Sequence, residues 1–293
     1  MTRSDSLAMN ELRTDRPIAV GIDGSKAAVQ AALWAVDEAV RRDAPLRLMY
    51  AMEQGKGLDA EPEVLARTFA AAETAIGRAL TAIESTGQQV KTEMEIVQGP
   101  AIRSLIAVSA SAAMVCVGAM GLRHFRAGRV GSTAAALAIS AQCHVAIVRG
   151  LHDQTGQLGG RIVVEVGNSS DCGELLGVAM EEARTRSATV QAIICRRTVS
   201  YGAAAEDKDD RRAIADLDRR LAGWRRRYPE IRVESAAVHN TLFEYLAGNR
   251  GSVQLAIVGS DNREHLKELI GPVGSAVLQD GDCSLLVVKG RHL

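Results

Sequence analysis

Residues 114–133 read MVCVGAMGLRHFRAGRVGST and place an apolar strand, a glycine-rich loop and a helix start in direct succession. Three glycines stand at the spacing G-x2-G-x9-G and two hydroxyl residues follow them: Gly118, Gly121, Gly131, Ser132 and Thr133. Glycines have no Cβ, so they allow a tight turn and a close approach of the backbone to a ligand. The free N–H groups and the positive end of the following helix attract phosphate, and two hydroxyls add donors. The stretch therefore predicts a phosphate-binding loop at the end of a strand.

The chain repeats its own pattern at an offset of about 140 to 144 residues. Residues 17–25 read PIAVGIDGS and residues 161–169 read RIVVEVGNS, each an apolar run that ends in turn residues. Later apolar runs match in the same way: 46–51 with 189–195, 92–99 with 232–240, 114–118 with 255–259, and 144–148 with 284–288. A steady offset over this length indicates a duplicated domain.

The length of 293 residues also fits two domains of ordinary size. Residues 151–160, LHDQTGQLGG, are polar and glycine-rich without periodicity, which is typical of a linker. We therefore expect a first domain at 17–150 and a second at 161–293. The polar residues 1–16 are expected to form a disordered tail.

Apolar runs alternate with helical segments in each half, as in residues 17–25 followed by 27–42. The apolar runs are continuous rather than alternating, which indicates strands buried on both faces of a parallel sheet. Helices on both faces of such a sheet give the doubly wound α/β class. We therefore predict two tandem doubly wound parallel sheets.

The composition excludes several classes of protein. Lys and Arg total 35, as do Asp and Glu, and aromatic residues are 3%, which argues against a nucleic-acid or membrane surface. The five cysteines are widely spaced without a CxxC pair, so neither a disulfide framework nor a metal site is predicted. No apolar run reaches the length of a signal peptide or membrane span, so we expect a cytoplasmic protein.

Residues 17–293 resemble the universal stress proteins in three features. These are the G-x2-G-x9-G(S/T) pattern, the aspartate of VGIDGS and the expected strand order. The resemblance implies a five-stranded parallel sheet in each domain, of the adenine nucleotide alpha hydrolase-like type. It also implies ATP, with or without magnesium, or a related adenine nucleotide across the strand ends. Carried over to this chain, the adenosine side is Gly21, Ile22, Asp23 and the backbone of Ala51, and the ribose and phosphates lie at Gly118, Met120, Gly121, Arg129, Gly131, Ser132 and Thr133.

The resemblance further implies that the halves associate through the apolar final strands, 144–148 and 284–288, and that two chains form a homodimer. The function expected from it is nucleotide-dependent regulation in the stress response, through an unknown protein partner. No catalytic residues are predicted, and efficient hydrolysis is not expected. A nucleotide-independent scaffold and a slow ATPase are the alternatives. The choice among ATP, AMP and cyclic nucleotides stays open.

The second half departs from the motif. Asn262 stands in the place of Gly121, Pro272 in that of Ser132, and Gly167 in that of Asp23. Proline has neither an N–H nor a hydroxyl, so two phosphate donors disappear. We expect this half to bind nucleotide weakly or not at all.

Other polar residues have simpler explanations. Ser25 and Ser132 are expected to start helices rather than act as nucleophiles, and His124 is expected at the surface. Arginines at 211–227 alternate with aspartates, which predicts a solvated helix face with local ion pairs. Cys172 is expected in a loop and is the cysteine we would test by alkylation.

Overall fold

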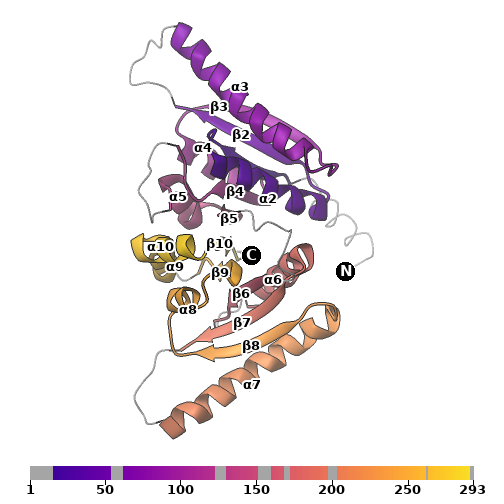
Figure 1. The fold of residues 1–293 in the computed structure, drawn as a ribbon, viewed down its shortest axis with the longest axis vertical. Coiled ribbons are helices and arrows are strands. Elements are labelled where there is room, and N and C mark those ends of the chain that lie inside the picture. Colours follow the sequence, from indigo (N-terminus) through magenta and orange to yellow (C-terminus); the bar gives the residue numbers. More distant parts are fainter. Residues whose placement is uncertain are drawn as a thin grey trace. The chain divides into compact units, whose positions relative to one another are not determined.

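The computed structural model describes residues 16–53, 62–122, 130–150, 160–167, 172–196, 203–261 and 263–290. The chain divides after residue 151 into two compact units, each of which is taken here by itself (Figure 1). The expected tail at 1–16 and linker at 151–160 lie almost wholly outside the described residues.

The first unit is a five-stranded parallel sheet with helices on both faces. Its elements are β1 (Ile18–Ile22), α2 (Lys26–Arg42), β2 (Leu46–Met52), α3 (Pro62–Glu84), β3 (Thr92–Gln98), α4 (Ala101–Ser109), β4 (Met114–Gly118), α5 (Ser132–Ser140) and β5 (His144–Val148). The strand order is β3-β2-β1-β4-β5, and all neighbours are parallel. The order reverses between β1 and β4, so α2 packs with α3 while α4 packs with α5. This confirms the doubly wound prediction.

The central strands form the core of this unit because they are covered on both faces. Every residue of β1 except Gly21 is buried, as is every residue of β4 except Gly118. Helix α2 begins where Ser25 Oγ accepts a hydrogen bond from the N–H of Ala28 at 3.1 Å, which confirms Ser25 as a helix start. Because β1 and β4 are parallel neighbours, their carboxyl ends lie at the same edge of the sheet.

The second unit repeats this arrangement. Its elements are β6 (Arg161–Glu165), α6 (Cys172–Arg186), β7 (Thr189–Cys195), α7 (Ala203–Arg227), β8 (Val233–Val238), α8 (Leu242–Gly248), β9 (Val253–Gly259), α9 (Arg263–Ile270), α10 (Pro272–Asp280) and β10 (Ser284–Val288). The strand order is β10-β9-β6-β7-β8, again parallel throughout. Within their own units β5 and β10 are therefore edge strands, as expected, while association through these edges stays a prediction. Helix α9 was not predicted from the sequence.

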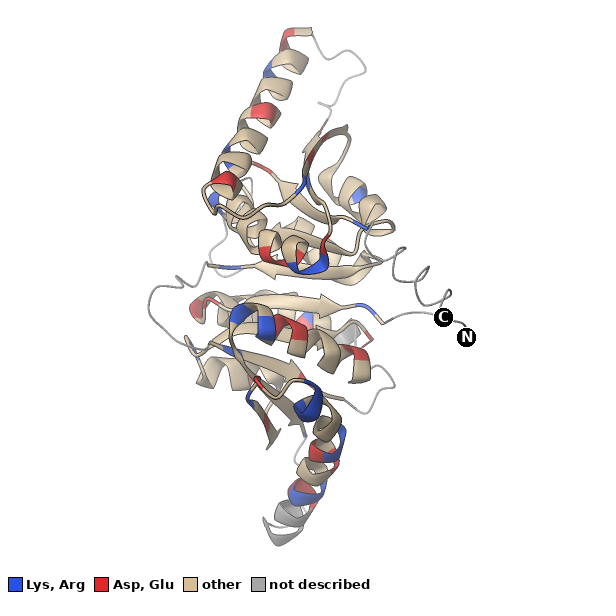
Figure 2. Cartoon of the chain, turned by 90° about the vertical axis from the view of Figure 1, so that its right-hand side faces the viewer, with Lys and Arg blue, Asp and Glu red and all other residues tan. Residues whose placement is uncertain are grey.

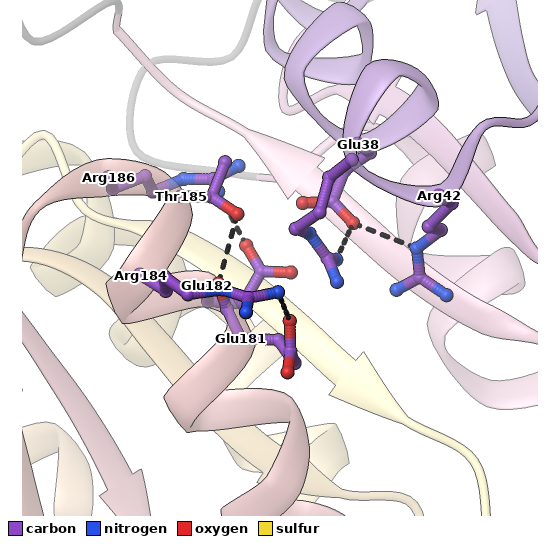
Figure 3. Close-up of polar contacts among 8 residues, drawn as sticks. Glu38, Arg42, Glu181, Glu182, Arg184, Thr185 and Arg186 are labelled. Atoms are coloured by element: carbon purple, nitrogen blue, oxygen red, sulfur yellow. Dashed lines mark hydrogen bonds and ion pairs between the residues drawn. The ribbon is translucent and has the colours of Figure 1, made fainter. Parts of the chain in front are cut away.

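A buried ion pair marks the duplication at the level of single side chains. Glu38 on α2 is fully buried and accepts a hydrogen bond from Arg42 Nε at 3.1 Å (Figure 3). Glu182 on α6 is also fully buried, with Arg186 at 2.7 Å, and both residues stand 144 positions after their counterparts. Because a buried carboxylate needs a partner, the repeat has kept both members of each pair.

Helix α7 carries the expected alternation of charges. Figure 2 shows Lys and Arg interleaved with Asp and Glu along it. Arg219 forms an ion pair with Asp216, and Arg225 lies 2.9 Å from Asp218. These pairs confirm a solvated face with local ion pairs rather than a basic patch.

Candidate functional site

A cavity of about 450 Å³ opens at the carboxyl ends of the central strands in the first unit. That volume lies in the range of small-molecule sites, and the β1–β4 boundary is the switch point where ligands bind in open α/β sheets. Ten of the eleven residues predicted for the site line it: Gly21, Ile22, Asp23, Ala51, Gly118, Met120, Gly121, Gly131, Ser132 and Thr133. Arg129 and His124 lie outside the described residues. The structure thus brings together residues more than one hundred positions apart, while their contact with a ligand stays a prediction.

Asp23 follows β1 and connects two loops of the cavity. Its Oδ1 accepts a hydrogen bond from the N–H of Ser25 at 2.9 Å. Its Oδ2 accepts one from the N–H of Leu122 at 3.1 Å, across 99 residues of sequence. The carboxylate therefore holds the start of α2 and the turn after β4 in one arrangement.

The glycines of the motif have protein neighbours that explain two of them. A Cβ on Gly118 would lie 2.6 Å from the carbonyl carbon of Ala27, and one on Gly121 would lie 2.7 Å from Asp23 Oδ2. Real Cβ atoms essentially never make such contacts. A Cβ on Gly131 would meet only ordinary contacts, with Ala119 O at 3.5 Å. The sequence-based explanation, a close approach to a ligand, is therefore not needed for Gly118 or Gly121.

Two helices begin at the cavity wall without a side-chain cap. Helix α5 starts at Ser132 after Gly131, and helix α4 starts at Ala101 after Pro100. The first turns of both helices line the cavity. The first N–H groups of a helix have no partner inside it and attract anions. The contribution of α5 was predicted, whereas that of α4 was missed, although the Gly99–Pro100 pair after an apolar run is a signal for it.

The remaining wall is largely apolar. Met49, Tyr50, Leu105 and Val117 line it from β2, α4 and β4. Sequence reasoning missed them because strand and helix interiors give no sign of which residue faces a cavity. Among the described residues of the lining, Asp23 and Glu53 carry charge and none is basic.

At two strand positions that line the cavity in the first unit, the second unit has larger side chains. Ile18 pairs with Leu46 in the first unit, and Ile162 pairs with Val190 in the second. Equivalent positions of these strands therefore differ by 144 residues. By that register Glu165 replaces Gly21, and Cys195 replaces Ala51. Burial raises the pKa of the Cys195 thiol, and the Glu165 carboxylate, its hydrogen-bond partner, raises it further. A carboxylate and a thiol thus occupy the positions that form an apolar floor in the first unit.

The helix that corresponds to α5 is covered at its start. Helix α10 begins with Pro272, which has no N–H, after Gly271. A Cβ on Gly274 would lie 2.5 Å from the carbonyl oxygens of Glu268 and Leu269, so the end of α9 packs against this first turn. Ser275 Oγ also donates to the Ile270 carbonyl at 2.8 Å. Carbonyl oxygens from the end of α9 therefore lie beside the first turn of α10.

The helix that corresponds to α4 is capped by side chains. Thr241 Oγ1 accepts a hydrogen bond from the N–H of Glu244, whose carboxylate accepts one from the N–H of Thr241 at 2.8 Å. The bond from the Thr241 N–H, and then one that the Thr241 hydroxyl donates to the same carboxylate at 3.0 Å, lower the pKa of the Glu244 carboxyl. Near the end of β6, Arg220 donates to the carbonyl of Gly167, the residue in the place of Asp23, at 3.3 Å. Asn262 lies outside the described residues.

The expected position of Cys172 is wrong. It is the first residue of α6 rather than part of a loop, and it is buried, with 9% of its surface exposed. Cys116, Cys143 and Cys283 are buried as well. Within the described part of the chain, no three His, Cys, Asp or Glu side chains are grouped to hold a metal ion.

The family model of the universal stress proteins matches residues 15–149 and 160–289. The chain belongs to this family. Universal stress protein Rv2028c of Mycobacterium tuberculosis is 51% identical over 285 residues, which cover 97% of this chain and 100% of the relative. Universal stress protein Rv3134c of the same organism is 42% identical over 293 residues, with 97% of this chain and 100% of the relative covered. Both are similar along their whole length, so the tandem arrangement is shared.

One solved structure has the same fold over nearly the whole chain. A universal stress protein from Archaeoglobus fulgidus superposes with a TM-score of 0.70 at 14% identity, covering 95% of this chain and 98% of that chain. A universal stress protein in complex with cAMP matches 45% of this chain and 96% of its own, at 24% identity and a TM-score of 0.38. None of the helices that the structure describes is both long and apolar enough to span a bilayer.

Proposed function

We propose that the first unit of this universal stress protein binds one adenine nucleotide, ATP, and that the protein acts as a nucleotide-dependent regulator in the stress response. The observation that carries the proposal is the convergence of two uncapped helix starts, those of α4 and α5, on one cavity of about 450 Å³. Two sets of free N–H groups favour an anionic ligand, and the apolar wall suits a base.

The adenosine and the phosphates of the ligand would lie at different sides of the cavity. Gly21, Ile22, Asp23 and Ala51 would take the adenosine, where the floor has little side-chain volume. The phosphates would lie against the first turn of α5, at Gly131, Ser132 and Thr133, with Arg129 as the cation. Bound nucleotide would then change the surface offered to a protein partner, so nucleotide would act by shifting a population.

The described residues fit a protein that hydrolyses ATP slowly at most. Asp23 lines the cavity, and each of its oxygens accepts a backbone hydrogen bond. We assign the carboxylate to holding these turns and give it no role in orienting water for phosphoryl transfer. We place the protein in the cytoplasm and propose that it is a homodimer. Size-exclusion chromatography with light scattering would test the homodimer.

Calorimetric titration of the full chain with ATP tests the proposal. We expect one site per chain, and a gain of ~2.7 kcal/mol in unfolding free energy when ATP is one hundredfold above Kd. Gly131→Glu should abolish binding while the fold is kept, because a Cβ there meets only ordinary contacts and the carboxylate repels phosphate. Gly77→Glu on α3, where a Cβ meets nothing within 4 Å, is the matched control and should bind as the unchanged chain does.

Three results would contradict the proposal in different ways. No heat at millimolar ATP, AMP or cAMP would favour the nucleotide-independent scaffold. Two equivalent sites per chain would contradict the assignment to the first unit. Multiple-turnover release of phosphate above background with magnesium would show a hydrolase.

A further inference from the structure

The Asp23 carboxylate occupies the space that a side chain at residue 121 would need. A Cβ on Gly121 would lie 2.7 Å from Asp23 Oδ2. The same oxygen accepts the hydrogen bond of the next residue, Leu122, at 3.1 Å. One group therefore both fills the volume beside the turn and holds the turn in place.

Backbone conformation does not explain the glycine. The glycines with positive φ in the described residues are Gly24, Gly87, Gly99, Gly150 and Gly251. Gly121 is not among them, so any residue could adopt its backbone angles. Among its described neighbours, the Asp23 carboxylate is the group within 3 Å of a Cβ there, and it can move away only by giving up its hydrogen bonds to Ser25 and Leu122.

The second unit exchanges the two sizes. Gly167 stands in the place of Asp23, and Asn262 stands in the place of Gly121. The turns start equivalently, because Ala119 donates to Val148 O and Ser260 donates to Val288 O, both at 2.9 Å. The first unit has its larger residue after the first strand and glycine after the fourth, whereas the second unit has glycine after the first strand and its larger residue after the fourth. This is the pattern expected when two positions share one volume.

We propose that Asp23 and Gly121 are a coupled pair, in which Asp23 is a positioning residue for the turn of Met120, Gly121 and Leu122. In this account residue 121 is glycine because of Asp23, not because of a ligand. The coupling acts in the chain without nucleotide. Its consequence for binding, a cavity wall set before the ligand arrives, rests on the proposed function.

A double-mutant cycle on the full chain without nucleotide tests the coupling. Gly121→Asn should lower the midpoint of thermal unfolding by roughly 5 °C, because the new side chain collides with the carboxylate. Asp23→Gly should lower it less. The double variant, which copies the second unit, should unfold above Gly121→Asn, because removing the carboxylate frees the volume. Losses that simply add would overturn the proposal.

Two controls separate volume from charge and from a general effect of asparagine. Asp23→Asn has the size of aspartate without its charge, so it should not rescue Gly121→Asn. Rescue by Asp23→Asn equal to that by Asp23→Gly would overturn the shared-volume account. Gly77→Asn, at a glycine with open space around its Cβ position, should change the midpoint by less than about 2 °C.

Hydrogen exchange reports the positioning role directly. In Asp23→Gly the Leu122 amide loses its acceptor and should exchange at least about tenfold faster, while amides of β8 stay protected. Unchanged exchange at Leu122 would overturn this role. Calorimetry with ATP keeps the two proposals apart. Coupling without ATP binding removes the proposed function alone, whereas ATP binding with additive losses removes this inference alone.

Discussion

The two units share a strand order but differ at the carboxyl ends of their central strands. In the first unit α4 and α5 begin without side-chain caps at a cavity with Gly21 and Ala51 on its floor. In the second unit a capping box closes α8, the end of α9 packs against α10, and Glu165 and Cys195 stand on the floor. The sheet needs none of these features to form. A duplicated fold can therefore change the carboxyl ends of its strands through a few local differences while it keeps its architecture.

The largest expected difference between the units concerns the glycine that ends the fourth strand of each. Gly118→Ala places a methyl 2.6 Å from the Ala27 backbone, whereas Gly259→Ala meets nothing within 4 Å among the residues that the structure describes. We expect the first change to cost ~3 kcal/mol of unfolding free energy and the second less than about 0.5 kcal/mol. Denaturant unfolding of both variants measures the difference. Equal losses would show that the close approach of α2 is not specific to the first unit.

Exchanging the first residues of α5 and α10 tests the phosphate end. Ser132→Pro removes one N–H and one hydroxyl but fits the fold, because Gly131 is already extended, with φ −61° and ψ 152°, and proline suits the first helical position. ATP affinity should fall at least tenfold, equal to ~1.4 kcal/mol, with little change in stability. Pro272→Ser should not create a second site, because the carbonyl oxygens at the end of α9 remain. Calorimetry measures both, and a new site in Pro272→Ser would show that proline alone had closed the second unit.

The capping box of α8 is a smaller difference and depends on pH. Thr241→Ala should cost about 1 kcal/mol near neutral pH. The pKa of Glu244 is lowered below its ordinary value of 4.5 by the Thr241 N–H, which alanine keeps, and by the Thr241 hydroxyl, which alanine lacks. The part of the loss that comes from the hydroxyl bond is therefore complete above that pH and disappears as pH falls through the lowered pKa. The gap between the variant and the unchanged chain should therefore narrow in acid unfolding experiments. A gap that stays constant down to pH 3 would contradict a role for the ionised carboxylate.

The smallest expected effect lies on the outer strands. Hydrogen bonds from Arg47, and then from Lys91, lower the pKa of the Glu93 carboxyl on β3. Glu93→Gln should cost less than ~1 kcal/mol at neutral pH, and the cost should disappear as pH falls through the lowered pKa of the folded state. Glu234 on β8 pairs with Arg232, which is 78% exposed, so Glu234→Gln should cost less still. Urea midpoints across pH measure both; a larger loss at Glu234 would reverse the comparison.

Much of the fold followed from local patterns. Continuous apolar runs predicted parallel strands, and the steady offset predicted two domains of the same class, because both signals are repeated many times along the chain. The described ends of most strands fall within two residues of the expected ranges. Helix α9 and the buried start of α6 at Cys172 were not foreseen, since short helices and the burial of their first turns depend on what packs against them.

The sequence by itself determined where the G-x2-G-x9-G motif of the first unit is and that the second unit departs from it. Glycine spacing and a proline in place of Ser132 are local facts about backbone donors. Only the tertiary structure decided that α4 begins at the same cavity as α5, and that Gly121 is paired with Asp23. It also decided that Glu165 and Cys195 replace the floor in the second unit. These relations join residues far apart in the chain, and strand register and helix packing set them, so no local pattern carries them.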